Sequence, residues 1–231
     1  MPHAAQRSAA VNPAATDVVY ELRLSDPQYV MEEAGEYFSR RGAVWEAMKN
    51  LNQRMESEGI DFVLIGALAL ALHGYSRMTV DIDVLIAREG LEKFHDLLIG
   101  RGYIPAFPGA RRSIRETENR VRIDMVLAGE YPGDGKPKEI AFPSPEQAKT
   151  LVSGMPVVPL ETLIELKLAS GISAPHRALD LADVIALIRA RSLDAELAEH
   201  LHPVVREKYR ELWVAAQTPE VVEEQEQPPQ R

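Results

Sequence analysis

Two segments of the chain alternate apolar and polar side chains with a period of two, and this pattern constrains the fold more than any other feature of the sequence. A period of two is typical of a β-strand that buries one face. We therefore expect residues 79–86 and 120–127 to form half-buried strands of a sheet. Their apolar positions are Val80, Ile82, Val84 and Ile86 in the first segment and Val121, Ile123, Met125 and Leu127 in the second.

The remaining periodic segments indicate a sheet flanked by helices. The run Asp61-Phe-Val-Leu-Ile65, apolar after its first residue, is typical of a buried strand, and residues 157–158 offer another short one. The fold class predicted is therefore α/β (α+β), a mixed-sheet core followed by a helical C-terminal part. Helical patterns cover residues 28–58, 67–73, 91–101, 159–168, 178–191 and 193–215, with Gly59, Gly74 and Gly102 ending the first three.

Composition divides the chain into four segments. Residues 1–18 are rich in Ala, Pro and small polar residues, and residues 217–231 are rich in Glu, Gln and Pro. Such segments cannot bury enough apolar surface to fold, so we predict a flexible tail at each end, the second one acidic. Between them we predict a core with an N-terminal helical segment at residues 19–155 and the helical C-terminal part at residues 156–216.

The residues that are absent exclude several kinds of site. The 231 residues include no cysteine, which excludes disulfides, thiolate zinc sites and cysteine nucleophiles, and the six histidines are scattered. A net charge of −9 argues against bulk binding of nucleic acid but not against a local basic patch or a metal-bridged nucleotide. No apolar run approaches the roughly 20 residues that span a membrane. We therefore expect a cytoplasmic protein without a membrane partner.

Asp81 and Asp83 are the strongest candidates for a functional site. They are two residues apart on a predicted strand, so both carboxylates emerge on one face. Neighbouring carboxylates repel unless a cation lies between them, and hard oxygen ligands suit Mg²⁺, with Mn²⁺ as an alternative. The competing interpretation is a solvated strand edge, although apolar residues on both sides of the pair are unusual for an exposed edge.

Asp124 lies on the polar face of the second strand and joins this pair if the two strands are neighbours in register. Three carboxylates can hold two metal ions about 3.5–4 Å apart, one activating an attacking hydroxyl and one neutralising a triphosphate and the leaving pyrophosphate. Asp81, Asp83 and Asp124 are thus predicted as catalytic residues and metal ligands. Gly66, at a strand-to-helix turn, would let backbone N–H groups approach a phosphate, although glycine also occurs at such turns for packing alone.

Three motifs in this order resemble the nucleotidyltransferase superfamily: Ile65-Gly66-Ala67, the segment from His73 to Thr79, and Asp81-Ile82-Asp83. The closest likeness is to its AbiEii-type branch, which includes toxins of type IV toxin–antitoxin systems. That branch also has a lysine-bearing helix and then an Arg–Asp-bearing helix, which match residues 166–169 and 177–183. Ala67 departs from the usual second Gly or Ser, and Leu179 stands where a basic residue often precedes the Asp.

The resemblance implies transfer of a nucleoside monophosphate from a nucleoside triphosphate to a hydroxyl acceptor. The implied nucleotide-binding residues are Gly66, Ala67, Ser76, Arg77, Lys167 and Asp180. Three alternatives stay open: Arg77 could pair with an aspartate, Lys167 could be a surface lysine, and Asp180 could cap a helix.

The acceptor is open between tRNA or another RNA, a protein side chain and a small molecule, and the toxin branch implies a cognate antitoxin partner. Residues 111–122 are the densest basic stretch and could guide RNA, but interspersed glutamates are more typical of a solvated hairpin. Two other functions compete: a nucleotide-binding or regulatory protein of the same fold without catalytic activity, and a metal-dependent phosphohydrolase.

Overall fold

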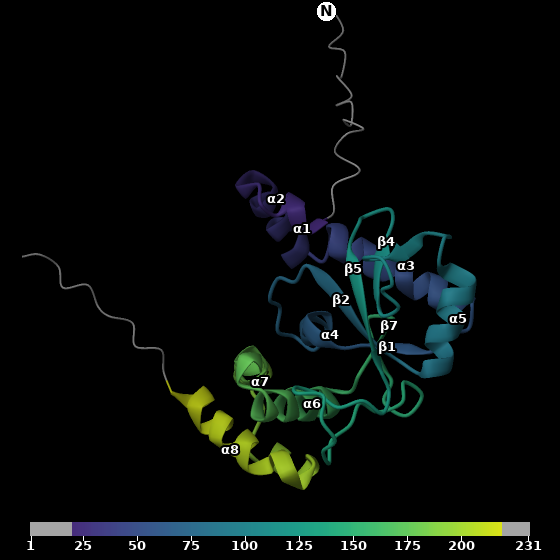
Figure 1. Cartoon of the computed structure of the whole chain (residues 1–231). Helices are drawn as coiled ribbons and strands as arrows, with labels where there is room; N and C mark the ends of the chain where they lie inside the picture. Colours follow the sequence, from purple (N-terminus) through teal and green to yellow (C-terminus); the bar gives the residue numbers. More distant parts are fainter. Residues whose placement is uncertain (1–19, 219–231) are drawn as a thin grey trace, which may run out of the picture.

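The computed structural model describes residues 20–218, and a seven-stranded mixed sheet forms its centre (Figure 1). The strand order is β3-β4-β5-β2-β1-β7-β6. Only β2–β5 and β1–β7 are parallel among these neighbouring pairs. The prediction of a mixed α/β fold is confirmed. The strands are β1 Phe62–Leu64, β2 Asp81–Ile86, β3 Tyr103–Pro105, β4 Ser113–Glu116, β5 Arg122–Leu127, β6 Thr150–Val152 and β7 Met155–Val157.

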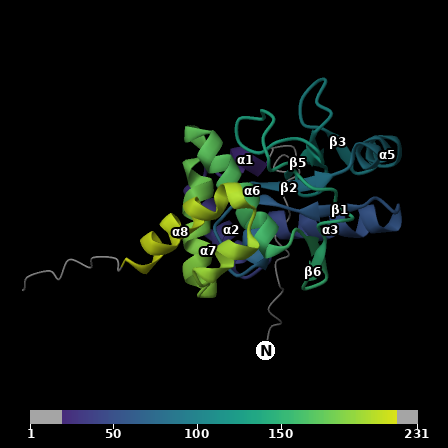
Figure 2. The same cartoon turned by 90° about the horizontal axis from the view of Figure 1, so that it is seen from below.

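The helices gather in separate groups around the sheet. In Figure 1, α1 and α2 lie at the top, whereas α6, α7 and α8 lie together at the bottom. Figure 2 shows the same three C-terminal helices packed against one another at one end of the strands. The helices are α1 Tyr20–Arg23, α2 Pro27–Phe38, α3 Ala43–Ser57, α4 Gly66–Leu72, α5 Arg88–Leu98, α6 Leu160–Ser173, α7 Ala178–Arg191 and α8 Pro203–Gln217, with 3₁₀ turns at Pro175–Arg177 and Glu196–His200.

The two faces of β2 have different surroundings, as the alternation predicts. Ile82, Val84 and Ile86 are fully buried, and α5 packs on their face because Gly90 lies directly against the Ile86 side chain. Asp81 and Asp83 emerge on the opposite face, where α4 begins. The central strands therefore bury an apolar stripe on one face and present carboxylates on the other, where Leu85 is also buried.

The prediction of a single helix over residues 28–58 is wrong, because α2 ends at Phe38 and α3 begins at Ala43. Gly42 has φ +86°, a backbone conformation that only glycine adopts readily. The buried Glu33 accepts a hydrogen bond from the Ala43 N–H at 2.8 Å, which stabilises the start of α3. Both helices share one apolar spacing, so periodicity could not reveal the break between them.

Other boundaries differ less. Strands β3, β4 and β6 were not predicted as separate elements, although β4 and β5 do form the hairpin expected at residues 111–122. Helix α6 continues five residues beyond the predicted end at 168, to Ser173. The predicted boundary between residues 155 and 156 falls inside β7, and the predicted tails fall almost entirely outside the described residues. Across residues 20–218, none of the helices has the length and apolar character needed to cross a membrane.

Replacing Gly42 by alanine tests the helix break. An alanine Cβ would lie 2.7 Å from Glu33 Oε1, and the backbone would keep a strained φ. We expect the free energy of unfolding, measured by urea titration, to fall by about 1–3 kcal/mol. The control is Gly35→Ala, in the exposed middle of α2, where a Cβ meets nothing within 4 Å. It should leave stability unchanged or raise it by up to about 1 kcal/mol. An equal effect of both changes would contradict a special requirement for glycine at position 42.

Candidate functional site

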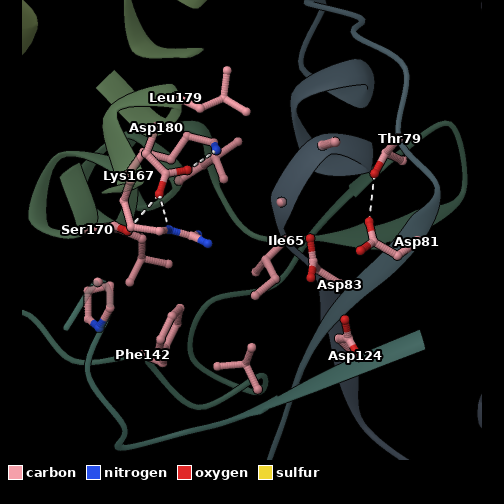
Figure 3. A pocket seen from close by; sticks show the side chains of 18 of the residues that line it. Ile65, Thr79, Asp81, Asp83, Asp124, Phe142, Lys167, Ser170, Leu179 and Asp180 are labelled. Carbon is pink, nitrogen blue, oxygen red and sulfur yellow. Dashed lines mark hydrogen bonds and ion pairs between the residues drawn. The ribbon is translucent and has the colours of Figure 1, made fainter. Parts of the chain in front are cut away.

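A cavity of about 480 Å³ lies between the carboxylate-bearing strands and helices α6 and α7 (Figure 3). All the predicted site residues except Ser76 line it, although they come from segments 114 residues apart in the chain, from Gly66 to Asp180. Ser76 is exposed and is not among the lining residues. The lining residues predicted from sequence are Gly66, Ala67, Arg77, Asp81, Asp83, Asp124, Lys167 and Asp180.

The register of β2 and β5 brings the three strand aspartates together. The two strands are parallel neighbours, with Asp83 opposite Asp124 and Asp81 opposite Arg122. Residues opposite each other point to the same face of a sheet, so all three carboxylates lie on one wall of the cavity, as Figure 3 shows. The strand pairing on which the prediction for Asp124 depended is therefore present.

Asp83 is the electrostatic centre of this wall. Within residues 20–218 its carboxylate has no hydrogen-bond or ion-pair partner. Burial, together with the negative charges of Asp81 and Asp124, raises the pKa of Asp83 to about 7, and the charges of Lys167 and Arg177 oppose this shift. A carboxylate with this environment binds positive charge or a proton readily.

Gly66 lies against Asp83, and this contact accounts for the glycine. Its φ is +63°, and a Cβ at this position would lie 2.1 Å from Asp83 Oδ2. The backbone N–H of Ile65 also donates to the carbonyl oxygen of Asp83 at 3.0 Å. The sequence alone leaves two explanations for Gly66, the close approach of a phosphate and packing. The structure shows that the turn must first accommodate a carboxylate.

Arg122 shares the predicted polar face of its strand with Asp124, but the only role predicted for it lies in the basic stretch. Its guanidinium donates to Asp81 Oδ2 at 2.7 Å and to Asp124 Oδ2 at 3.1 Å. Thr79 and Ser113 each donate a hydroxyl, at 2.7 Å, to the other oxygen of Asp81 and of Asp124 respectively. The alternation of β5 places Arg122 on the same face as Asp124, which is the signal that could have identified it.

The opposite wall of the cavity is a buried network of charges on α6 and α7. Lys167 is 5% exposed, so it is not a surface lysine, and its ammonium donates to Asp180 at 2.9 Å and to Asp183 at 2.7 Å. Arg77 donates to both oxygens of Asp183, at 2.8 and 3.1 Å. The aspartate with which Arg77 pairs thus lies on α7 and not on β2.

Asp180 belongs to the same network and does not cap α7 through its side chain. Its oxygens accept hydrogen bonds from Lys167, from Ser170 at 2.6 Å and from Arg177 at 2.9 Å. Burial alone would raise the pKa of Asp180, but the charge of Lys167 and the hydrogen bonds hold it below its ordinary value. Asp183 carried no predicted role. Its spacing of three residues from Asp180, which places both on one helix face, was the available signal.

Apolar side chains complete the cavity between the two charged walls. Phe142 and Leu179 are among the lining side chains in Figure 3, and Leu179 is 56% exposed. The other apolar lining residues include Ile65, Val126, Pro132, Leu163 and Leu166. A bound molecule would therefore contact charged groups at two sides and apolar groups between them.

The oxygen donors suit a divalent cation that takes few protein ligands. Mg²⁺ usually binds one or two carboxylates and completes its octahedron with water and substrate phosphates. The unpartnered carboxylate of Asp83, with its pKa raised by burial and two neighbouring carboxylates, fits such an ion. No three acidic or histidine side chains of residues 20–218 are grouped closely enough to enclose a metal by themselves. This arrangement suits magnesium brought in with a substrate better than a closed structural metal site.

No protein-family model and no curated protein sequence matches this chain. Several solved structures are similar to it. A candidate nucleotidyltransferase from Thermotoga maritima is 19% identical over 58% of this chain and 88% of its own, with a TM-score of 0.43. ANT(2″)-Ia, in complex with adenylyl-2″-tobramycin, is 15% identical over 72% and 97%, with a TM-score of 0.47. A nucleotidyltransferase-like antigenic protein from Paracoccidioides brasiliensis is 14% identical over 62% and 74%, with a TM-score of 0.41. These likenesses are distant, so the function of this chain must be argued from its own residues.

Asp83→Asn should change stability in a pH-dependent way in metal-free buffer. Because the pKa of Asp83 is raised to about 7, folding favours its protonated form, and this contribution is lost as pH rises from about 4 through 7. At pH 8 the variant should melt at least about 2 °C above the original protein, the shift that about 1 kcal/mol gives in a domain of this size. At pH 4.5 the two melting temperatures should converge. A constant difference at both pH values would contradict the raised pKa.

Removal of Asp183 should destabilise the protein strongly. Asp183 is 1% exposed and accepts hydrogen bonds from both Lys167 and Arg77, so Asp183→Ala leaves the buried ammonium and the guanidinium short of a counter-charge. We expect the free energy of unfolding to fall by about 3–5 kcal/mol. Asp61→Ala, which removes an exposed partner of Lys149, is the control and should cost at most about 1 kcal/mol. Both free energies of unfolding are measured by urea titration. Similar losses for the two changes would contradict a larger contribution of the buried network to stability than of an exposed ion pair.

Proposed function

We propose that this chain is a magnesium-dependent nucleotidyltransferase, which moves a nucleoside monophosphate from a nucleoside triphosphate to a hydroxyl acceptor and releases pyrophosphate. One observation carries the proposal: the aspartates of β2 and β5 face the Lys167 network across a single cavity. A metal-bound triphosphate needs carboxylates on its metal side and cations on its phosphate side. The motif likeness to the nucleotidyltransferase superfamily supports the same reaction.

Each wall has a proposed part in binding. Asp81, Asp83 and Asp124 would hold the metal, which supplies charge neutralisation of the triphosphate and activation of the attacking hydroxyl when bound. On the other wall the three cations Lys167, Arg77 and Arg177 outnumber the two carboxylates Asp180 and Asp183 with which they pair, so the network keeps a net positive charge. Arg177 lines the cavity and its side chain is 52% exposed, so it can reach a phosphate oxygen directly.

The proposed reaction is an in-line displacement. The acceptor oxygen bonds to the α-phosphorus, the bond from that phosphorus to the bridging oxygen breaks, and pyrophosphate leaves with the electron pair. The hydroxyl proton passes to the carboxylate of Asp124, which Ser113 orients through its hydrogen bond. Gly66 and Ala67 line the cavity beside Asp83 and would contact phosphate through their backbone.

The finer assignment rests on the motif likeness alone. On that likeness we propose an AbiEii-type toxin in the cytoplasm, with a cognate antitoxin as its partner and tRNA or another RNA among its acceptors. The basic stretch adds little to RNA binding, because Arg111, Arg112 and Arg115 pair with Glu92, Glu130 and Glu21. A protein side chain or a small molecule thus remains an equal alternative as acceptor.

A second candidate is a nucleotide-binding protein of the same fold without transferase activity. The specific observation in its favour is Arg122, whose guanidinium bridges two of the three proposed metal ligands. Ala67, which lacks the hydroxyl of the serine often found at this position, points the same way.

Incubation with each of the four labelled triphosphates, magnesium and total cellular RNA or protein tests the transfer. We expect pyrophosphate release and labelling of one acceptor class. Asp81→Ala and Asp83→Ala should each lower the rate at least about 10³-fold, since metal charge stabilisation is worth several kcal/mol and about 1.4 kcal/mol is tenfold. Asp96→Ala, an exposed carboxylate on α5, is the matched control and should act like the original protein.

The same experiment separates the alternatives. Unchanged transfer by the Asp81 and Asp83 variants would refute the mechanism. Calorimetric binding of a triphosphate without pyrophosphate release, across all acceptors, would favour the non-catalytic protein. Release of inorganic phosphate without a labelled acceptor would indicate a phosphohydrolase.

A further inference from the structure

Arg122 occupies the position that a cation would take between two carboxylates. Its Nη2 donates to Asp81 at 2.7 Å and its Nε donates to Asp124 at 3.1 Å, so one guanidinium bridges both carboxylates. The parallel pairing sets Arg122 directly opposite Asp81 and two residues before Asp124 on β5. An arginine at this position allows three aspartates to share one face of the sheet without a metal.

Glu21 on α1 offers Arg122 a second partner. The third guanidinium nitrogen of Arg122, Nη1, lies 3.9 Å from Glu21 Oε1. Glu21 is itself held by Arg115, whose Nη1 donates to Oε2 at 2.9 Å and whose Nη2 donates to Oε1 at the longer distance of 3.4 Å. The side chain of Arg122 is 35% exposed, so it has room to turn from the aspartates toward Glu21.

The other contacts of the two aspartates do not obstruct a metal. Thr79 and Ser113 donate to the Oδ1 atoms of Asp81 and Asp124, whereas Arg122 takes both Oδ2 atoms. The hydroxyls can therefore keep the carboxylates oriented while the Oδ2 atoms change partner. Only Arg122 has to leave.

From this geometry we propose that Arg122 is an internal counter-ion that competes with divalent metal for Asp81 and Asp124, and that Glu21 receives it when metal binds. The inference rests on the metal site of the proposed function, and it adds a control on how tightly that site binds a divalent metal ion. Arg122 is a positioning residue in this scheme. Metal binding then requires exchange of one ion pair for another, without loss of a buried charge partner.

The test is a titration with Mn²⁺, without nucleotide, followed by the electron paramagnetic resonance signal of the free ion at about 0.15 M salt, where distant charges are screened. Arg122→Gln should bind Mn²⁺ about tenfold more tightly than the original protein, because the competing cation is gone. Glu21→Gln should bind it severalfold more weakly, because Arg122 loses its alternative partner. The double variant should match Arg122→Gln, since Glu21 acts only through Arg122.

Two further variants separate the bridging contact of Arg122 from the effect of its charge alone. Arg111→Gln removes the same charge from an exposed pair with Glu92 and should leave Mn²⁺ affinity unchanged. Arg122→Lys keeps the charge but cannot bridge two carboxylates with a planar fork, so its affinity should fall between those of the original protein and Arg122→Gln. Circular dichroism confirms that each variant is folded before titration, and Arg122→Lys serves alone if the glutamine variant fails to fold.

The outcomes distinguish this inference from the proposed function. Equal or weaker Mn²⁺ binding by folded Arg122→Gln, with binding by the original protein intact, overturns the counter-ion role and leaves the metal site standing. An additive double variant overturns the role of Glu21. Absence of Mn²⁺ binding in every variant overturns both the counter-ion role and the metal site itself.

Discussion

The parallel pairing of β2 with β5 is the constraint on which the cavity depends. It sets Asp83 opposite Asp124 and Asp81 opposite Arg122, so one stretch of ladder fixes three acidic groups and the cation that bridges two of them. A slip of one residue would turn the polar face of one strand toward the core and expose Ile82 or Ile123. Both of those side chains are fully buried, so the apolar face enforces the register of the charged face. Core packing and site geometry are thus two results of the same alternation.

The second wall depends on a different principle, the mutual neutralisation of buried charges. Arg77, in the segment before β2, meets Asp183 on α7 across 106 residues of sequence, and Lys167 on α6 joins them. Such a network gives little net stability, because removing charges from water is unfavourable, yet breaking it is costly. Its effect is to hold the C-terminal helices at a defined position beside the sheet. The cavity is therefore formed jointly by the sheet and the C-terminal helices.

Alternation and glycine placement were enough to predict β1, β2 and β5 and the helices that follow β1 and β2, because these elements are set by local pattern. The same pattern predicted the shared face of Asp81 and Asp83. The break between α2 and α3 at Gly42 was not predicted, because the two consecutive helices share one apolar spacing. The short strands β3 and β6 were not predicted, because a segment of three residues is too short to show a periodicity. Arg122 and Asp183 are different: local spacing places them on the same faces as Asp124 and Asp180, but their ion pairs to residues 41 and 106 positions away depend on the tertiary fold.

Residues 66 and 83 share a single volume. The space that a side chain at position 66 would fill already contains a carboxylate oxygen of Asp83. The two positions are therefore sterically linked, and bulk can be gained at one only if it is given up at the other. A chain that enlarged residue 66 would need a shorter residue at position 83, which removes the charge at the centre of the wall, and it would still keep a strained φ at position 66. Gly66 at the start of α4 and Asp83 in β2 are thus mutually dependent parts of one structural feature.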